Sequence, residues 1–107
     1  MIHIVIRQSG SHFVGMHFEG HALFDVHGKD LVCAAISSIA IGTLNSLDII
    51  LGSDAFDYKI IRDESIDFQI KEANETSDIL LEMAHIQCET VCQNYPKNIE
   101  IKKEKVK

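Results

Sequence analysis

The chain contains 107 residues, of which 46% are hydrophobic and 24% are charged, with a single proline. This composition is ordinary for a globular protein, and the length suits one domain, residues 1–107, with a hydrophobic core of its own. Ten Lys and Arg residues against sixteen Asp and Glu residues give a formal net charge of −6. Direct binding to nucleic acid is not expected, because proteins that bind it concentrate positive charge to displace counterions.

The first two elements are predicted to form a β-hairpin. Isoleucine occupies every second position of residues 2–6, and a second alternation begins after the turn around Gly10. One face of the second strand is predicted to consist of Val14, Met16 and Phe18. The opening segment is too short for the apolar region of a signal peptide, and no basic region precedes it, which predicts a cytoplasmic protein.

A long helix is predicted after a loop from Gly20 to Gly28. Asp30 suits its N-cap, because the carboxylate can accept hydrogen bonds from N–H groups of the first turn, and Gly52 suits its end. Residues 31–51 are apolar around most of the circumference, which is typical of a central helix buried on several sides. Polar residues interrupt this stretch, which favours a buried helix over a membrane span.

The second half of the chain repeats the pattern of a hairpin followed by a helix. Alternation over residues 56–60 and 66–70, with a polar turn between them, predicts two further strands. Asn74, Thr76 and Ser77 are candidate caps for the second helix. The predicted core-facing stripe of this helix consists of Ile79, Met83, Ile86 and Thr90 or Val91.

A short last strand is predicted at Ile99 and Ile101, and residues 102–107 are predicted to form a charged, frayed tail. The resulting order is ββαββαβ, with hairpins in place of long crossovers. This order predicts an α+β fold: a mainly antiparallel sheet with a buried central helix and a second amphipathic helix.

The segment with catalytic potential surrounds Cys33. This residue is predicted to lie in the first turn of the long helix, where unpaired N–H groups and the helix dipole favour a thiolate over a thiol. His21 follows the end of the second strand, so its imidazole can approach the sulfur as a general base and later act as a general acid toward the leaving group. The two residues have the outline of a Cys/His dyad.

Each of these residues also has another interpretation. Cys33 fits a small buried hydrophobic residue at the start of a packed helix, and Asp30 fits either a plain N-cap or a residue that orients His21. A zinc-type site is the chemical alternative, although no Cys-x-x-Cys or His-x-x-x-His pair supports it. The residues of that alternative are His17, His21, His27 and Cys33. No metal or other cofactor is expected.

The remaining cysteines, Cys88 and Cys92, lie four residues apart on one face of the second predicted helix. This spacing suits a packed stripe beside Ala84 and Val91, so both are interpreted as structural thiols of a reducing compartment.

The run from Gly20 to Ser37 resembles the signature of a known family, the ribosomal-processing cysteine proteases called Prp. That signature is Gly-His-Ala, a loop, and then Gly-x-Asp, an apolar residue, Val-Cys-Ala-Ala, an apolar residue and Ser. The matching residues are Gly20, His21, Ala22, Gly28, Asp30, Val32, Cys33, Ala34, Ala35 and Ser37. The chain length and the ββαββαβ order are similar as well.

The resemblance implies an endopeptidase that removes a short N-terminal extension from a large-subunit ribosomal protein before ribosome assembly. By that likeness Cys33 is the nucleophile and His21 the base, while Asp30 supports the pair and Ser37 shapes the site. The resemblance also implies a homodimer with a mobile loop over the site. The loop residues concerned are Gly20, Ala22, His27 and Gly28. His27 is an alternative base, because it brings a second imidazole near Cys33.

A different class of function stays open beside this one: a ribosome-associated factor that binds a ribosomal protein without cutting it. The negative charge suits a basic ribosomal partner in both cases, because opposite charges raise the encounter rate. Neither a membrane nor a nucleic acid is an expected partner. Preferential alkylation of Cys33 by iodoacetamide distinguishes an activated nucleophile from a packed core cysteine.

Overall fold

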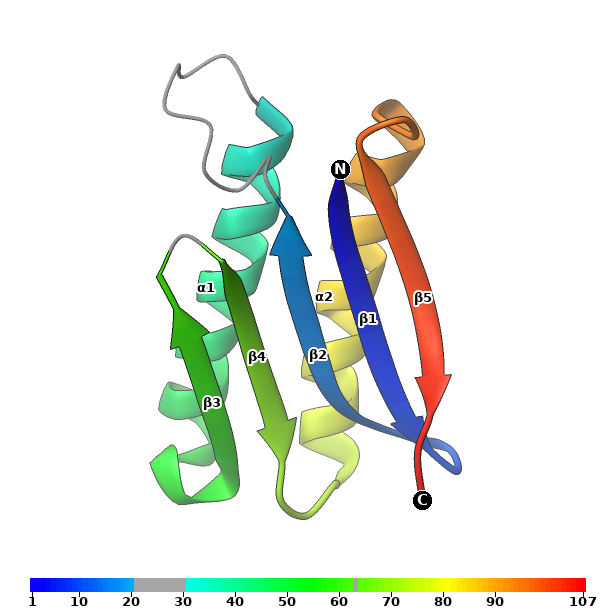
Figure 1. Ribbon diagram of the computed structural model, residues 1–107. Coiled ribbons are helices and arrows are strands. Elements are labelled where there is room, and N and C mark those ends of the chain that lie inside the picture. The colour runs from blue at the N-terminus through cyan, green and yellow to red at the C-terminus, as the bar shows by residue number, and fades with distance from the viewer. Residues whose placement is uncertain (21–30, 63) are drawn as a thin grey trace.

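Five strands form one sheet, and two helices cover one of its faces, in the computed structural model, which describes residues 1–20, 31–62 and 64–107 (Figure 1). The strands are β1 (Ile2–Ser9), β2 (His12–Gly20), β3 (Phe56–Ile61), β4 (Ser65–Ile70) and β5 (Ile99–Lys105). The helices are α1 (Leu31–Leu51) and α2 (Glu75–Asn94), and a short 3₁₀ helix, η2 (Ser53–Ala55), precedes β3. The predicted α+β fold and the order ββαββαβ are confirmed.

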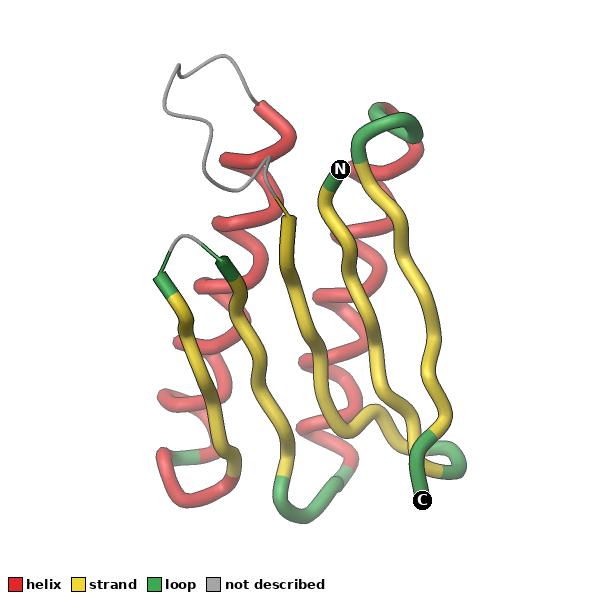
Figure 2. Tube along the Cα trace, viewed as in Figure 1, coloured by secondary structure: helices red, strands yellow, loops and turns green. Residues whose placement is uncertain are grey.

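The strands lie in the order β3-β4-β2-β1-β5, so that β3 and β5 form the two edges (Figure 2). The hairpins β1–β2 and β3–β4 are antiparallel, and β2 joins them by antiparallel pairing with β4. After α2 the chain returns on the far side of β1, where β5 pairs with β1 in parallel. The sheet is therefore mainly antiparallel, as the two predicted hairpins require.

The charged C-terminal segment belongs to the sheet. β5 continues in register with β1 until Lys105 lies opposite Gln8, and the N–H of Val106 donates to the Gln8 carbonyl at 2.7 Å. The prediction of a frayed tail over residues 102–107 is therefore wrong. Lysine-rich termini are usually solvated, but here the lysines lie on an edge strand, where charge discourages pairing with other chains.

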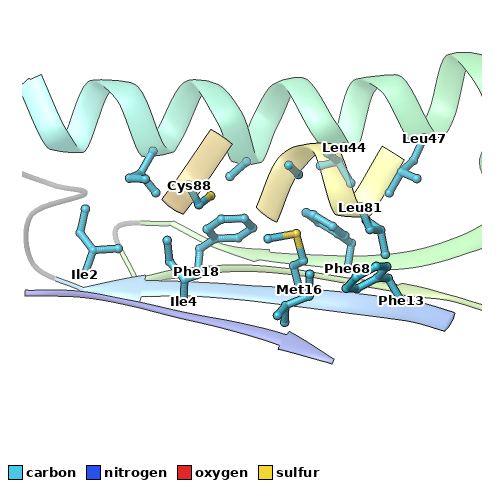
Figure 3. Packing of buried hydrophobic residues seen from close by; sticks show 14 of the residues in the cluster. Ile2, Ile4, Phe13, Met16, Phe18, Leu44, Leu47, Phe68, Leu81 and Cys88 are labelled. Carbon is cyan, nitrogen blue, oxygen red and sulfur yellow. The ribbon is translucent and has the colours of Figure 1, made fainter. Parts of the chain in front are cut away.

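The core lies between the sheet and the helices (Figure 3). Ile2, Ile4 and Ile6 alternate along β1 and are fully buried on the helix side. The rings of Phe18 in β2 and Phe68 in β4 lie 5.9 Å apart between centroids, in the tilted arrangement that aromatic pairs prefer. This packing holds β2 firmly between its two neighbours.

A bulge in β2 changes which residues face the core. The pairing of β2 with β1 shifts by one residue, and Val14 is the residue left over. The alternation therefore reverses at this point, so that Phe13 joins the core cluster while Val14 does not. Of the predicted face, Met16 and Phe18 belong to the core cluster, whereas Val14 is buried, at 9% exposure, but lies outside that cluster.

α1 is buried along one face and not around its circumference. Its buried residues are Val32, Cys33, Ile36, Ala40, Thr43, Leu44 and Leu47. On other sides of the helix Ile41, Ile49 and Ile50 are exposed, which corrects the prediction of burial on several sides. By length and composition alone α1 could span a membrane, but its row of buried residues packs it on the sheet as the core helix of this fold.

α2 packs mainly through a face other than the predicted one, although the predicted Val91 is half-buried against the core cluster. Its buried residues are Ser77, Leu81, Ala84 and Cys88. In contrast, the predicted Ile79, Met83 and Ile86 are 68%, 50% and 56% exposed. The start of the helix agrees with the sequence: the Asn74 side chain accepts a hydrogen bond from the Ser77 N–H at 2.8 Å, within a capping box.

Candidate active site

Cys33 lies in the first turn of α1, as the sequence predicts, because the helix begins at Leu31. The residue is 9% exposed, and its helical neighbours Val32 and Ile36 belong to the core cluster. The N–H groups of a first helical turn and the positive end of the helix dipole favour negative charge on a nearby sulfur. The position therefore suits a nucleophilic cysteine.

The last residue of β2, Gly20, fixes the point at which the chain leaves the sheet. Figure 1 shows the end of β2 and the first turn of α1 at the same end of the molecule. Gly20 has a φ of +145°, and a Cβ at this position would meet the Met1 carbonyl oxygen and lie 2.8 Å from the Ile2 Cα. Glycine is required here for two reasons, the left-handed backbone and the close approach of β1.

Three of the predicted site residues lie in the described part of the chain: Gly20, Cys33 and Ser37. Ser37 follows Cys33 by one turn of α1, on the same side of the helix, and is half-buried. The residues outside the described part are His21, Ala22, His27, Gly28 and Asp30. The predicted dyad, N-cap and loop therefore stay predictions.

The other two cysteines have structural environments. Cys88 is fully buried, and burial, together with the nearby charge of Glu89, raises the pKa of its thiol to about 12. It therefore stays protonated at neutral pH. The Sγ of Cys92 donates to the Ile99 carbonyl at 3.6 Å, where α2 lies beside β5. Both residues pack as the sequence predicts.

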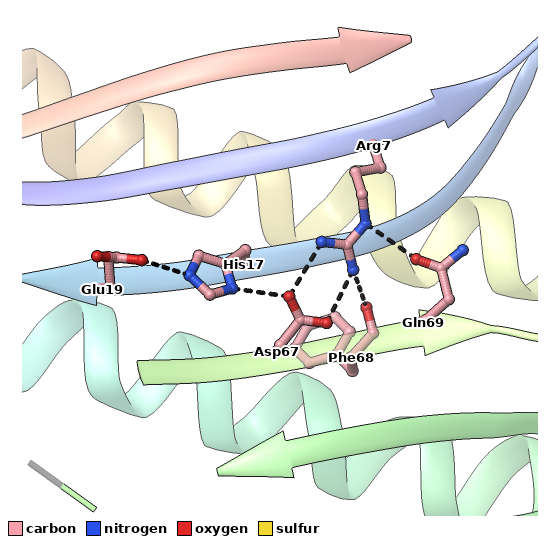
Figure 4. Close-up of polar contacts among 6 residues, drawn as sticks. All are labelled: Arg7, His17, Glu19, Asp67, Phe68 and Gln69. Atoms are coloured by element: carbon pink, nitrogen blue, oxygen red, sulfur yellow. Dashed lines mark hydrogen bonds and ion pairs between the residues drawn. The ribbon is translucent and has the colours of Figure 1, made fainter. Parts of the chain in front are cut away.

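A polar cluster on the open face of the sheet, opposite the helices, lies close to the end of β2 (Figure 4). Arg7 of β1 donates to the two carboxylate oxygens of Asp67 in β4 at 2.9 and 3.0 Å. The Nδ1 of His17 lies 2.7 Å from Asp67, and its Nε2 lies 2.6 Å from Glu19. Gly15 leaves room for this arrangement, because a Cβ there would lie 2.5 Å from the Arg7 Nη2. The cluster ties β1, β2 and β4 together.

The surroundings of the His17 imidazole favour its charged form. Burial by itself lowers the pKa of His17, but the hydrogen bonds and negative charges of Glu19 and Asp67 outweigh it and raise the pKa above its usual value. Burial likewise raises the pKa of Asp67, but Arg7 and His17 outweigh it and lower that pKa. Both ring nitrogens of His17 face carboxylates, and only the imidazolium donates from both.

This geometry bears on the zinc-type alternative. Both nitrogens of His17 lie within hydrogen-bonding distance of carboxylates, so a metal ion would have to displace one of these contacts to bind the ring. Within residues 1–20, 31–62 and 64–107, no three His, Cys, Asp or Glu side chains are grouped so as to hold a metal ion.

Comparison with known proteins decides the family. The sequence matches the family model described as cysteine protease Prp over residues 1–100. The chain belongs to the Prp family. The resemblance carried by the Gly20–Ser37 run is thereby confirmed, and the protein is a cysteine protease. A Prp relative, the ribosomal processing cysteine protease of Bacillus subtilis (strain 168), is 28% identical over 110 residues, which cover 94% of this chain and 96% of the relative.

Solved Prp structures share the fold over almost the whole chain. Two structures of the essential ribosomal processing protease Prp from S. aureus align with TM-scores of 0.85 and 0.83, at 22% and 21% identity. Each alignment covers 97% of this chain and 100% of the other. The first of these proteins is in complex with a covalently linked product peptide and the second with a substrate peptide.

Proposed function

We propose that this protein is an endopeptidase that removes a short N-terminal extension from a large-subunit ribosomal protein before ribosome assembly. The observation that supports it most is the position of Cys33 in the first turn of α1, within a chain of the Prp family. A ribosomal-processing relative covers the same length, and the structurally similar S. aureus protease binds substrate and product peptides.

In this proposal Cys33 is the nucleophile and His21 is the general base. The thiolate attacks the carbonyl carbon of the scissile peptide bond, and the imidazolium of His21 gives its proton to the departing amine. Water then hydrolyses the thioester and restores the thiol. N–H groups at the start of α1 stabilise the negative oxygen of each tetrahedral intermediate, and Asp30 and Ser37 support this end of the helix.

Cleavage of the full-length ribosomal protein, followed by mass spectrometry, tests the proposal directly. The expected product lacks a short N-terminal peptide, and Cys33→Ala abolishes its formation while circular dichroism shows the fold intact. Cys92→Ala is the matched control, because it removes a half-buried thiol elsewhere and keeps activity. Retained cleavage by Cys33→Ala would overturn the assignment of the nucleophile.

The assignment of the base has its own test. His21→Ala lowers turnover strongly, because both the thiol and the leaving amine need the imidazole. A larger loss from His27→Ala would mean that the base is His27. Asp30→Asn keeps an N-cap and removes the charge, so near-normal activity of that variant would limit Asp30 to capping.

The alternative, a binding factor that does not cut, predicts a different reactivity. An activated Cys33 reacts with trace iodoacetamide at neutral pH before the other thiols do, whereas the high pKa of Cys88 keeps that thiol unreactive. Equal, slow labelling of Cys33 and Cys92, together with binding but no cleavage, would favour the binding factor.

Homodimerisation and a cytoplasmic location belong to the same proposal. Ile79, Met83 and Ile86 form an exposed apolar stripe on α2, beside a hollow between the helices that Gly42 and Met83 help to line. Exposed apolar side chains grouped in this way are typical of an interface. Ile86→Lys shifts the sedimentation of the protein to that of a monomer, while Glu104→Gln on β5, with the same change of charge, leaves the dimer intact. A wild-type monomer would contradict the dimer.

A further inference from the structure

β3 is an edge strand whose exposed side chains are mainly apolar. It pairs on one side with β4, and no strand of the described residues pairs with its other side. Tyr58, Ile60 and Ile61 are 62%, 48% and 38% exposed. The opposite edge of the sheet differs, because the exposed residues of β5 are Lys102, Lys103, Glu104 and Lys105. Charges of that kind protect an edge from added strands. β3 is less protected, because its exposed charges are Asp57 and Lys59, which lie on the open face of the sheet.

The register shows on which side of the sheet the apolar residues of β3 lie. Tyr58 is paired with Phe68 and Ile60 with Ile66, and directly opposite residues of antiparallel strands project to the same face. Phe68 is fully buried in the core between sheet and helices. Tyr58 and Ile60 therefore extend the core row past the edge of the sheet, on the side that carries α1 and Cys33.

The direction of β3 leads toward the end of the sheet where Cys33 lies. Ile61 is paired with Ser65, and Ser65 is paired with Glu19 near the end of β2. Figure 1 shows that the end of β3, the end of β2 and the first turn of α1 share this end of the molecule. Six residues of extended strand span about 20 Å, so a short peptide paired along β3 reaches this end.

We propose that the peptide substrate binds as an additional strand along the outer edge of β3. Its backbone hydrogen-bonds to the outward N–H and C=O groups of β3, and its alternate apolar side chains pack on Tyr58 and Ile60. This inference rests on the proposed function and adds to it the place where the substrate is bound. It favours substrates with apolar residues at every second position before the scissile bond.

A peptide substrate fits this edge better than a second copy of the chain. The exposed apolar stripe of α2 offers a separate surface for a second copy, and a dimer through that helix layer leaves β3 accessible at the side of the sheet. β3 also runs toward the end of the molecule at which cleavage is proposed. Sheet extension by two β3 strands is the competing arrangement, and oligomeric state distinguishes it.

The first test separates substrate binding from chemistry. Ile60→Lys and Tyr58→Thr remove apolar contact surface from β3 while introducing residues that an exposed edge strand tolerates. Each is expected to raise KM for a peptide spanning the cleavage point by about tenfold while kcat changes less than about twofold. Glu104→Gln, on the other edge, is the control for the changed charge and is expected to leave KM unchanged. An unchanged KM in both β3 variants would overturn the proposal.

The second test reports on the backbone. In the Cys33→Ala protein, the same peptide is expected to slow hydrogen exchange of β3 amides, and N-methylation of the peptide is expected to weaken binding at alternate residues only. Equal effects at all positions, or an unprotected β3, would exclude strand addition. Loss of a dimer in Ile60→Lys would assign the edge to a second copy. In each case cleavage by the wild-type protein, measured separately, decides the proposed function.

Discussion

Replacing Asp67 by Asn tests the contribution of the polar cluster to stability. The substitution keeps the shape of the side chain but removes its charge, and it brings an NH₂ donor toward Arg7 and His17, which are donors themselves. Hydrogen bonds to charged groups contribute about 1.5–3 kcal/mol each. The Arg7 and Asp67 side chains are 16% and 31% exposed, so water screens part of this energy.

The expected loss for Asp67→Asn is therefore about 2 kcal/mol of unfolding free energy, smaller than the sum of the hydrogen bonds that change. For a domain of this size, such a loss lowers Tm by roughly 10 °C.

The loss should also depend on pH. The pKa of Asp67 is lowered in the folded protein, so its contribution is present above its usual pKa, near 4, and is lost as the pH falls through the lower folded value. The pKa of His17 is raised, so its contribution is complete below about 6.5 and is lost as the pH rises through the higher folded value. The difference in unfolding free energy between wild type and variant is therefore largest between about pH 4 and 6.5. Above this range, the contribution of the Arg7–Asp67 contact remains.

Urea unfolding at several pH values measures this difference. Asp57→Asn is the matched control, because Asp57 lies on the neighbouring strand, is 75% exposed, and is 3.8 Å from its partner Lys71. We expect no measurable loss of stability in the control. An equal loss in both variants, or a loss for Asp67→Asn that does not change with pH, would refute the reasoning.

Three further predictions concern the backbone, the second helix and the charge. Gly20→Ala should lower both the free energy of unfolding and kcat/KM, because the added Cβ meets β1. Gly10→Ala places its Cβ in open space and should lower the free energy of unfolding less. Chemical denaturation and peptide cleavage measure the two effects. Asn74→Ala removes the cap of α2 and should lower the unfolding free energy by about 1 kcal/mol in urea titrations, while Thr76→Ala serves as the comparison. Raising the salt concentration should lower kcat/KM with little effect on kcat, because the net charge of −6 attracts a basic substrate over distances that salt screens. A rate constant insensitive to salt would contradict that role of charge.

Local sequence patterns were sufficient for the order of the elements and for the position of Cys33, but not for the length of β5. The strands of the hairpins show period-two alternation. The two ends of the long helix are predicted by the N-cap candidate Asp30 and by Gly52. The third residue of a helix lies in its first turn, because an α-helix has about 3.6 residues per turn. The environment of Cys33 could therefore be predicted without knowing what packs against it.

Tertiary packing decided what periodicity left open. On α2, one stripe contains Ile79, Met83 and Ile86, and the other contains Leu81 and Cys88; both have helical spacing. Hydrophobicity favours the first stripe. The second stripe packs against the sheet and α1. It includes the small residues Ser77 and Ala84, which permit close approach of the helix. The Ser77 hydroxyl can be buried there because it donates a hydrogen bond to the Asn74 carbonyl at the cap.

The polar cluster could not be predicted for a related reason. His17, Glu19 and Asp67 occupy the outward positions of strands, where charged residues are usually solvated. Their contact depends on β2 pairing with β4, fifty residues away in the sequence. No local pattern predicts that pairing, because either strand of one hairpin could pair with either strand of the other.

The two faces of the sheet together explain why the site lies where it does. β2 is held on one face by Phe18 in the core and on the other by the His17 cluster, and it ends at Gly20 against β1. α1 is held from its first turn by Val32 and Ile36. The end of β2 and the first turn of α1 are thus both held by the core. In the proposed mechanism the nucleophile Cys33 lies at the start of α1 and the base His21 directly follows Gly20, so we expect the two to meet with little reorganisation, as efficient proton transfer requires.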